Sequence, residues 1–459
     1  MNKRVDLLNG NILKALIIMA VPIMATSFLQ MAYNMIDMIW IGRVGSNSVA
    51  AVGAAAMFIN LGTGIGAFLR VGGQVCVARS FGAGKMEEAA LYGRNAIQLG
   101  FIISVVYGLI LCIFTEELIG FFRFTEQVVI EEAQLYLYIM GIFIFLSIIN
   151  PVCTAVISAT ANSKTPFQIN TIGLLVNIVA DPILIFGLGP IPKMGINGAA
   201  IATVFAQAIV FILFIRYMKK DQQVFTKMHF SRPMKSHVIK NIVHIGMPAS
   251  VQCIMFSGIS MTIGRIIATW GEVAIAVQKV GIQIESVSYM AAEGFSLATN
   301  SFIAQNYGAN QHKRAVKGYR TALKVMIAWG LITTLALVVF PEMIFKIFIP
   351  EADVIPYGTD YLRILGYSQL FMCIEILTSG AFSAYGKTII PSTVSIIFTS
   401  MRIPMGIILG STALGLNGVW WAISLSSVFK GTILVALFIG YMKKYHKEDL
   451  AIEPASAAF

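Results

Sequence analysis

Apolar segments long enough to cross a lipid bilayer recur along the whole chain, and they limit its fold more than any other feature. The 459 residues are 57% hydrophobic and only 12% charged, about half the charged fraction of an ordinary soluble domain. Lipid offers the backbone no hydrogen-bond partner, so apolar runs of this length must be helices. About twelve such segments lie at residues 13–41, 48–76, 92–115, 129–158, 166–187, 197–217, 241–269, 273–303, 318–348, 358–384, 389–411 and 416–441. The sequence therefore predicts an all-α polytopic membrane protein with twelve transmembrane helices.

Basic residues supply the orientation of these helices. The formal net charge of +11 is spread over short clusters at both termini and in alternate loops, the largest running from Arg216 to Lys240. The remaining loops contain few basic residues, chiefly Arg43, Arg123, Lys193 and Lys346. By the positive-inside rule both termini are predicted to be cytoplasmic, in a multi-pass plasma-membrane protein. Scattered clusters also argue against a nucleic-acid partner, and we expect a monomer whose surroundings are membrane lipids.

The two halves of the chain resemble each other. Four motifs recur in order, at separations that shrink from 226 to 220 residues: Pro22 and Pro248, Phe81–Gly84 and Tyr307–Asn310, Ser158 and Ser383, and Gly195–Gly198 and Gly415–Gly418. This duplication predicts two pseudo-symmetric six-helix bundles with the same topology, an architecture typical of alternating access. We place an N-lobe at 1–217, a cytoplasmic linker at 218–240 and a C-lobe at 241–459.

The first apolar segment carries an acid, Asp37, in its second half. A carboxylate in a membrane span is costly and marks a relay or binding site more often than a structural contact. Tyr33 and Asn34 lie four and three residues earlier, so all three share one helical face. Pro22 removes a backbone hydrogen bond from the same helix and allows it to bend, which suggests a gating role.

A second acid, Asp181, follows Asn177 by four residues in the fifth segment, so both side chains face the same way. Thr203 begins the sixth segment. Asp181 could instead cap the end of its span, and a threonine in a membrane helix often bonds its own backbone. The repeat places Ile263 opposite Asp37 and Ile403 opposite Asp181. Both acids therefore belong to the N-lobe alone, where they suit binding of a proton or of sodium.

The C-lobe charges fit more than one interpretation. Opposite charges among Lys279, Glu285, Glu293 and Glu375 either neutralise one another or line a cavity. No motif of an enzyme, nucleotide site or structural metal site is present. The five cysteines lie far apart, and the glycine run Gly62–Gly66 lies inside an apolar segment without a preceding strand. We expect no enzymatic activity and no cofactor, so any transport would draw on an ion gradient.

Three stretches resemble the MATE (multidrug and toxic compound extrusion) transporters: Asp37–Gly45, the Asn177 and Asp181 pair, and Gly195–Thr203. The resemblance covers nearly the whole chain and is nearest to the prokaryotic DinF-like branch. It implies the MATE fold and a proton-coupled or, alternatively, sodium-coupled antiporter that exports organic cations and confers antibiotic resistance. The NorM-like branch uses acids in the seventh and tenth spans, where this chain has Gln252 and Glu375. The departure at the seventh span therefore favours the N-lobe, rather than the C-lobe, as the place of cation coupling.

The resemblance also implies roles for single residues. Cation coupling is assigned to Asp37, Asp181, Asn177 and Thr203, which would also hold Na⁺ if sodium is the coupling ion. Substrate contacts are assigned by the resemblance to Tyr33, Asp37 and Asn177, and gating to Pro22. We add Asn34, on the face of Asp37, and Asn150, a polar residue within a span, to the predicted substrate contacts. A lipid-linked oligosaccharide flippase of the same superfamily is the alternative, although the N-lobe acids favour a cationic substrate.

Overall fold

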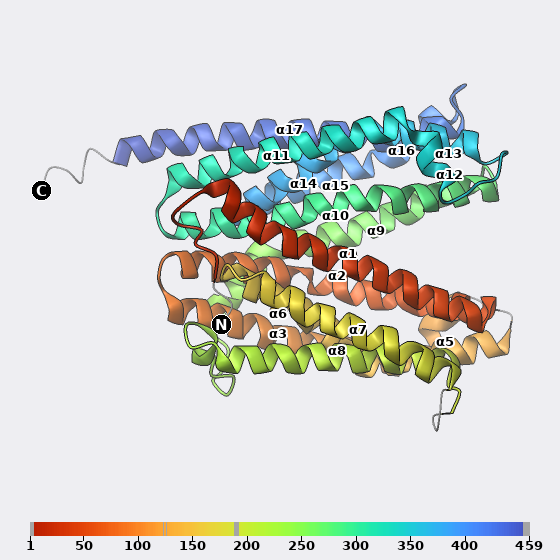
Figure 1. Cartoon of the computed structure of the whole chain (residues 1–459), viewed down its shortest axis with the longest axis horizontal. Helices are drawn as coiled ribbons and strands as arrows, with labels where there is room; N and C mark the ends of the chain where they lie inside the picture. Colours follow the sequence, from red (N-terminus) through yellow and green to blue (C-terminus); the bar gives the residue numbers. More distant parts are fainter. Residues whose placement is uncertain (1–3, 123, 125, 188–191, 453–459) are drawn as a thin grey trace, which may run out of the picture. The chain divides into compact units, whose positions relative to one another are not determined.

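The computed structural model describes residues 4–122, 124, 126–187 and 192–452. Arg123, one of the few basic residues of the loops predicted to face away from the cytoplasm, lies outside the described residues. Helices dominate these residues, with no strand among them (Figure 1). The first half contains α1 (Ile12–Val44), α2 (Ser46–Gly82), α3 (Met86–Ile113), α4 (Thr115–Gly120), α5 (Gln127–Ile142), α6 (Ile144–Ala159), α7 (Lys164–Phe186), α8 (Gly195–Lys220) and the 3-10 turn η1 (Phe225–Lys227). The second half contains α9 (Ser236–Ala268), α10 (Glu272–Gly308), α11 (His312–Val339), α12 (Pro341–Lys346), α13 (Ile355–Gly366), α14 (Gln369–Ala384), α15 (Ile389–Ser400), α16 (Arg402–Gly410) and α17 (Leu416–Ile452).

The helices repeat in the same order as the sequence motifs. Helices α1 and α9 both have 33 residues, α2 and α10 both have 37, α3 and α11 both have 28, and α4 and α12 both have 6. The pairs α5–α6 and α13–α14 are each broken by the same bend of 47°. A shared bend at equivalent breaks means that the two halves share their local geometry as well as their sequence pattern.

Each of the twelve predicted segments overlaps one long helix or one broken pair, except that 318–348 runs past the end of α11 at Val339 into the short helix α12. Within the described residues, nine helices are long and apolar enough to cross a membrane, or eleven spans if each bent pair counts as one. Helix α10 is the remaining predicted segment and is long enough, but it is not among those eleven. The predicted class, an all-α polytopic membrane protein, is confirmed.

The chain divides into two compact units. Unit 1 contains residues 1–8, 18–254 and 308–310, and unit 2 contains residues 9–17, 255–307 and 311–459. Most of α1 therefore belongs to unit 1, while its first residues belong to unit 2. The division also runs through α9.

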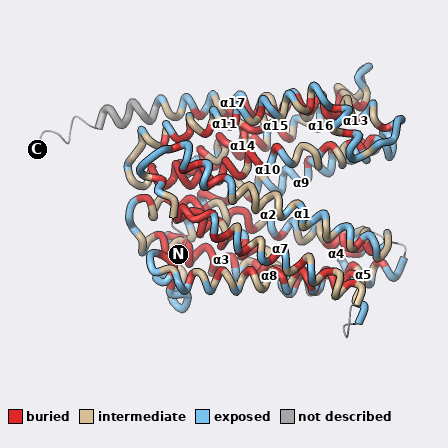
Figure 2. Tube along the Cα trace, in the orientation of Figure 1, coloured by how far each residue is buried: buried red, intermediate tan, exposed pale blue. Residues whose placement is uncertain are grey.

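Large apolar side chains face outward, as expected in lipid. Helix α3 buries a stripe of small residues, among them Gly93, Ala96, Gly100 and Gly108. Its opposite face exposes Phe101, Ile102, Val105, Val106, Leu109 and Ile113. Buried positions in Figure 2 accordingly run along the inner sides of the helices. Small residues allow close helix contact, which is how membrane helices associate without a hydrophobic driving force between them.

The repeated Gly-Ile-Asn-Gly motif has a structural explanation. Gly195 and Gly415 adopt φ values of +56° and +52°, which favour glycine, where α8 and α17 begin. Three residues later, a Cβ on Gly198 would lie 2.4 Å from the Leu184 carbonyl oxygen of α7. A Cβ on Gly418 would lie 2.3 Å from the Leu409 carbonyl oxygen. The motif therefore lets the last membrane helix of each half of the chain, α8 or α17, touch the backbone of the helix before it.

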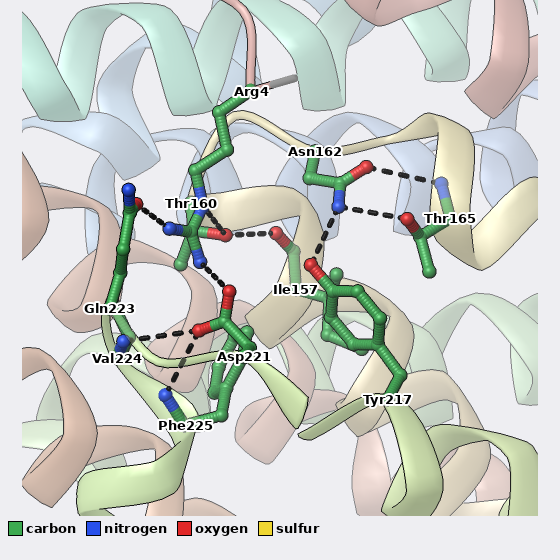
Figure 3. Close-up of polar contacts among 10 residues, drawn as sticks. All are labelled: Arg4, Ile157, Thr160, Asn162, Thr165, Tyr217, Asp221, Gln223, Val224 and Phe225. Atoms are coloured by element: carbon green, nitrogen blue, oxygen red, sulfur yellow. Dashed lines mark hydrogen bonds and ion pairs between the residues drawn. The ribbon is translucent and has the colours of Figure 1, made fainter. Parts of the chain in front are cut away.

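The polar stretch after α8 folds against unit 1. Figure 3 shows Asp221 accepting hydrogen bonds from the Val224 and Phe225 amides, at 3.1 and 3.2 Å, while it forms an ion pair with Arg4 at 2.8 Å. Arg4 also donates to Thr160 at 3.3 Å and to Gln223. These contacts attach the N-terminal segment to the loop.

The same stretch is held farther along by α3. Arg94 donates to the carbonyls of His229 and Pro233 at 3.3 and 3.2 Å, and Asn95 accepts from the Lys235 amide at 2.9 Å. Val224, Phe225 and Met228 are buried. Three apolar side chains therefore anchor this stretch, while most of its other residues are exposed.

Replacing Gly198 tests the close approach of α8 to α7. We expect Gly198→Ala to cost roughly 1–3 kcal/mol of stability, because the backbone of Leu184 cannot move as a side chain can. The thermal unfolding midpoint of the purified protein in detergent would fall by several degrees. Gly64→Ala is the matched control, since a Cβ there meets nothing within 4 Å. Equal midpoints for the two variants would contradict the explanation.

Candidate functional site

The candidate site lies in unit 1 and starts from the contact between α1 and α8. The hydroxyls of Tyr33 and Thr203 are 2.9 Å apart and share a hydrogen bond. Thr203 is 6% exposed, and it bonds across helices rather than only to its own backbone. The structure therefore brings together two of the residues singled out in the sequence, 170 positions apart.

Asp37 lies one turn beyond Tyr33 on the same face of α1. Its side chain is half-buried, and its Oδ1 atom is buried without a hydrogen-bond partner among the described residues. Tyr33 and Asp181 of α7 lie close enough to Asp37 to interact electrostatically with its carboxylate, so the three residues share one neighbourhood. Such a carboxylate oxygen has strong acceptor capacity that the surrounding described side chains do not use.

Asn177 and Asp181 form the second half of the site, on α7. The Asn177 amide donates to Asp181 Oδ1 at 3.1 Å, and both residues are almost completely buried, at 1% and 0% exposure. Asn177 Oδ1 and Asp181 Oδ2 find no partner among the described residues. Pro182 follows directly inside the helix and cannot donate to the carbonyl of Ile178. The predicted one-face arrangement of the pair thus places several buried oxygen atoms close together.

Tyr136 of α5 is a member of this neighbourhood that the sequence did not single out. It is 5% exposed and interacts electrostatically with both Asp37 and Asp181. Nothing in the local sequence distinguishes it from the other tyrosines, because its position depends on how α5 packs. The internal repeat could have drawn attention to Tyr136, because Tyr361 occupies the equivalent position in α13.

Two other predicted residues, Asn34 and Asn150, form hydrogen bonds with residues other than the two acids. Asn34 is exposed and accepts a hydrogen bond from Gln30 of the same helix at 3.3 Å. Asn150 is buried on α6 and donates to the Gln207 carbonyl at 3.0 Å. Gln207 is one turn beyond Thr203 on α8, so Asn150 lies near the site without joining the Asn177–Asp181 pair.

Pro22 lies within α1, which continues as one helix from Ile12 to Val44. The Pro22 carbonyl accepts a hydrogen bond from the Thr26 hydroxyl at 2.9 Å. The helix therefore tolerates the proline without a break, and a bend would only need to rearrange a turn that already lacks one backbone bond.

An aromatic pair lies beyond the acids. Trp40 of α1 packs edge-on against Phe186 of α7 with ring centroids 5.9 Å apart, and Arg43 lies 4.9 Å above the Trp40 ring. Each aromatic residue is three to five positions past an acid of its own helix. These rings lie among apolar residues around Ile41 and Ile185, which exclude water from that end of the site.

Unit 2 contains buried charges as well, but there they are paired. Glu375 and Lys430 lie 3.1 Å apart, with side chains 9% and 8% exposed. Arg402 donates to the hydroxyls of Ser426 and Ser427 at 2.6 and 3.1 Å, and its charge interacts with those of Glu375 and Glu285. Gln369 donates to Glu285 at 3.3 Å. Two acids and two bases thus offset one another, as intramembrane charges usually do.

Unit 2 has no copy of the unit 1 site. The repeat aligns Tyr33, Asp37 and Thr203 with three isoleucines, and these belong to the apolar core of unit 2 or pack against it: Ile259, Ile263 and Ile423. The framework is duplicated, whereas the polar constellation belongs to unit 1 alone.

Comparison with known proteins agrees with this duplication. The profile of the family described as MatE matches the chain twice, at residues 22–183 and 248–408. The two matches begin at Pro22 and Pro248, the pair that starts the internal repeat. Together they cover well over half of the chain.

Individual relatives match over almost their whole length. A probable multidrug resistance protein NorM of Thermotoga maritima is 25% identical, covering 93% of this chain and 92% of that protein. An FAD transporter of Shewanella oneidensis is 24% identical, covering 94% and 95% respectively. The crystal structure of a MATE protein in the straight conformation, 24% identical, superimposes with a TM-score of 0.88 and covers 97% of this chain and all of that one. The predicted fold of two six-helix bundles of the MATE kind is confirmed by this likeness.

The buried ion pair of unit 2 makes a testable contrast. Lys430→Met should destabilise the protein by about 3–5 kcal/mol, because it leaves Glu375 buried without its partner. The double variant Glu375→Leu/Lys430→Met should recover most of that loss, since apolar residues replace both charges. Thermal unfolding in detergent measures both effects.

A surface pair provides the control for this experiment. Lys346 and Glu342 lie 2.6 Å apart on α12, with side chains 50% and 58% exposed. Lys346→Met should barely move the unfolding midpoint, because exposed pairs are screened by water. A double variant in unit 2 that is no more stable than Lys430→Met would contradict the pairing argument.

Proposed function

The chain belongs to the MatE family, and from that premise we propose that it is a cation-coupled antiporter that expels organic cations through the plasma membrane. One observation supports this proposal most directly. Asp37 and Asp181 are acids of unit 1 whose charges interact, and within the described ranges neither forms an ion pair with a lysine or arginine. An acid left without a basic partner in a membrane bundle creates a place for an external cation.

Exchange follows if a coupling cation and a substrate cation compete for the same carboxylates. An organic cation neutralises the acids from the cytoplasmic side, and a proton or sodium ion neutralises them from the other side. The site is then never left charged and empty for long, because an uncompensated carboxylate in a membrane span costs about 3 kcal/mol. Each ion shifts the conformational equilibrium only by its difference in affinity for the two states.

The side chains divide this work by their chemistry. Asp37 lies on the proline-containing helix α1, where a change of its charge acts directly on the contact between Tyr33 and Thr203. Asn177 donates to Asp181 and so orients that carboxylate while leaving other oxygens available. In this mechanism, Pro22 is where α1 bends as the cavity of unit 1 contracts and substrate leaves.

We propose the proton as the coupling ion and sodium as the alternative. One carboxyl suffices for a proton, whereas sodium needs several oxygen ligands. The oxygens of Asp37, Asn177, Asp181 and Thr203 would supply those ligands, and three of these residues have a buried oxygen without a described partner. The donor set therefore fits either ion.

The proposed orientation rests on the basic residues. Both termini and the loop from Arg216 to Lys240 would face the cytoplasm, where such clusters are enriched. Relatives that differ in cargo, such as the FAD transporter, mean that the cargo must be argued from this chain's own site. The flippase alternative gains no support from these relatives, and the acids of unit 1 favour cations.

Replacing Asp37 tests the exchange mechanism. Asp37→Asn keeps the size of the side chain but removes its charge, so we expect ethidium efflux from energised vesicles to fall to the level of protein-free vesicles. Expression and the unfolding midpoint should remain near those of the unmodified protein. Glu342→Gln makes the same change on the exposed helix α12 and should leave efflux intact. Full efflux by Asp37→Asn would refute the mechanism.

Imposed gradients identify the coupling ion. In proteoliposomes we expect an inwardly directed proton gradient to drive ethidium export, and a sodium gradient at constant pH to drive little. Asp181→Asn should lower the proton-driven rate more than it lowers expression. Export that follows sodium alone would transfer the coupling role to sodium, and export without any gradient would contradict antiport.

A further inference from the structure

Unit 2 contains a basic cavity at the start of two helices. The cavity, of about 530 Å³, is lined by the entry into α1 and by the first turns of α11. Its lining residues are Gly10, Asn11, Ile12, Leu13, Lys313, Arg314, Lys317 and Thr321. All of them belong to unit 2. We call it the α1–α11 cavity.

One face of α11 carries the positive charge of this cavity. Lys313, Lys317 and Thr321 follow one another at intervals of four residues, so they form a single row along the helix. Both lysines are exposed, and neither forms an ion pair with an acid in the described part of the chain. Their ammonium groups are therefore available to an anion.

Arg314 is fixed in the same cavity. It donates to the Asn9 carbonyl at 2.9 Å, and its guanidinium lies 5.5 Å from the centre of the Phe302 ring. These contacts hold a third cation beside the two lysines and also attach the segment before α1 to α11. The cavity thus has one immobilised and two adjustable positive charges.

The entry into α1 adds a helix N-terminus. The Asn11 carbonyl accepts from Ala15 at 3.1 Å and its side chain accepts from the Lys14 amide at 3.0 Å, so Asn11 caps the helix. α11 also begins at this cavity, at His312. The positive ends of two helix dipoles therefore add to the three basic side chains.

The position of the cavity relative to the membrane indicates that its anionic ligand is a lipid. Both α1 and α11 are candidate membrane spans, so their first turns lie where lipid headgroups lie. Leu13 and Ile17, one turn apart on α1, are 41% and 40% exposed and continue from the cavity toward the apolar region. A ligand that combines a phosphate with acyl chains matches both the charge and this apolar surface.

We propose that the α1–α11 cavity binds the headgroup of an anionic phospholipid, with its phosphate between Lys313 and Lys317 and its acyl chains along Leu13 and Ile17. This site is independent of the cation site in unit 1 and of the direction of transport. It anchors the first turn of the helix that carries Asp37, so lipid occupancy stabilises the start of α1.

Native mass spectrometry of the full-length protein tests the site. Detergent-solubilised protein is titrated with phosphatidylglycerol or with zwitterionic phosphatidylcholine. We expect Lys313→Gln/Lys317→Gln to bind phosphatidylglycerol roughly tenfold more weakly, because each lysine contributes to anionic lipid attraction. Lys219→Gln/Lys220→Gln, which removes two exposed charges at the end of α8, should bind like the unmodified protein.

A charge-preserving variant keeps the test independent of folding. Lys313→Arg/Lys317→Arg should retain phosphatidylglycerol binding, while all variants unfold at similar temperatures in phosphatidylcholine nanodiscs. Equal phosphatidylglycerol binding by the two glutamine variants would overturn the proposal. Equal binding of phosphatidylglycerol and phosphatidylcholine by the unmodified protein would also overturn it. Displacement of the lipid by millimolar inorganic phosphate would also overturn it, in favour of a soluble anion.

Discussion

The neutralisation of charge inside the helix bundles is the constraint on which the rest of this structure depends. Lipid and apolar side chains offer no solvation to a carboxylate, so each buried acid needs a partner. Unit 2 provides that partner internally, through Glu375 with Lys430 and through Arg402 near Glu285. Unit 1 leaves Asp37 and Asp181 without a described basic partner, and this difference is what suits it to bind a cation that comes and goes.

Duplication explains how the two units came to divide these roles. The first four helices of each half have equal lengths, and both halves have the same 47° bend and the same close contact at Gly198 and Gly418. Framework features are retained twice because backbone packing tolerates little change. The positions facing the interior diverged, since isoleucines at 259, 263 and 423 stand where unit 1 has Tyr33, Asp37 and Thr203.

Two described polar segments outside the bundles make specific contacts with the helices. Asp221 organises the loop after α8 by accepting hydrogen bonds from two backbone amides and pairing with Arg4 (Figure 3). Arg94 holds the loop farther along. At the start of α1, Arg314 attaches the chain through the Asn9 carbonyl. These contacts hold basic side chains in defined positions. The sequence pattern alone shows only that the loops are rich in basic residues.

Hydropathy, proline and glycine positions and the internal repeat were sufficient to predict the helical segments, the duplication and the restriction of two acids to the first half. Each of these depends on local periodicity or on comparison of the chain with itself. The one-face relation of Asn177 and Asp181 was also predictable, because four residues make about one helical turn. Only the tertiary structure placed Tyr136 beside the acids, left Asn34 exposed, paired Tyr33 with Thr203 and matched Glu375 with Lys430. Those relations join helices far apart in sequence, and they depend on the rotation and packing of each helix, which a one-dimensional pattern does not contain.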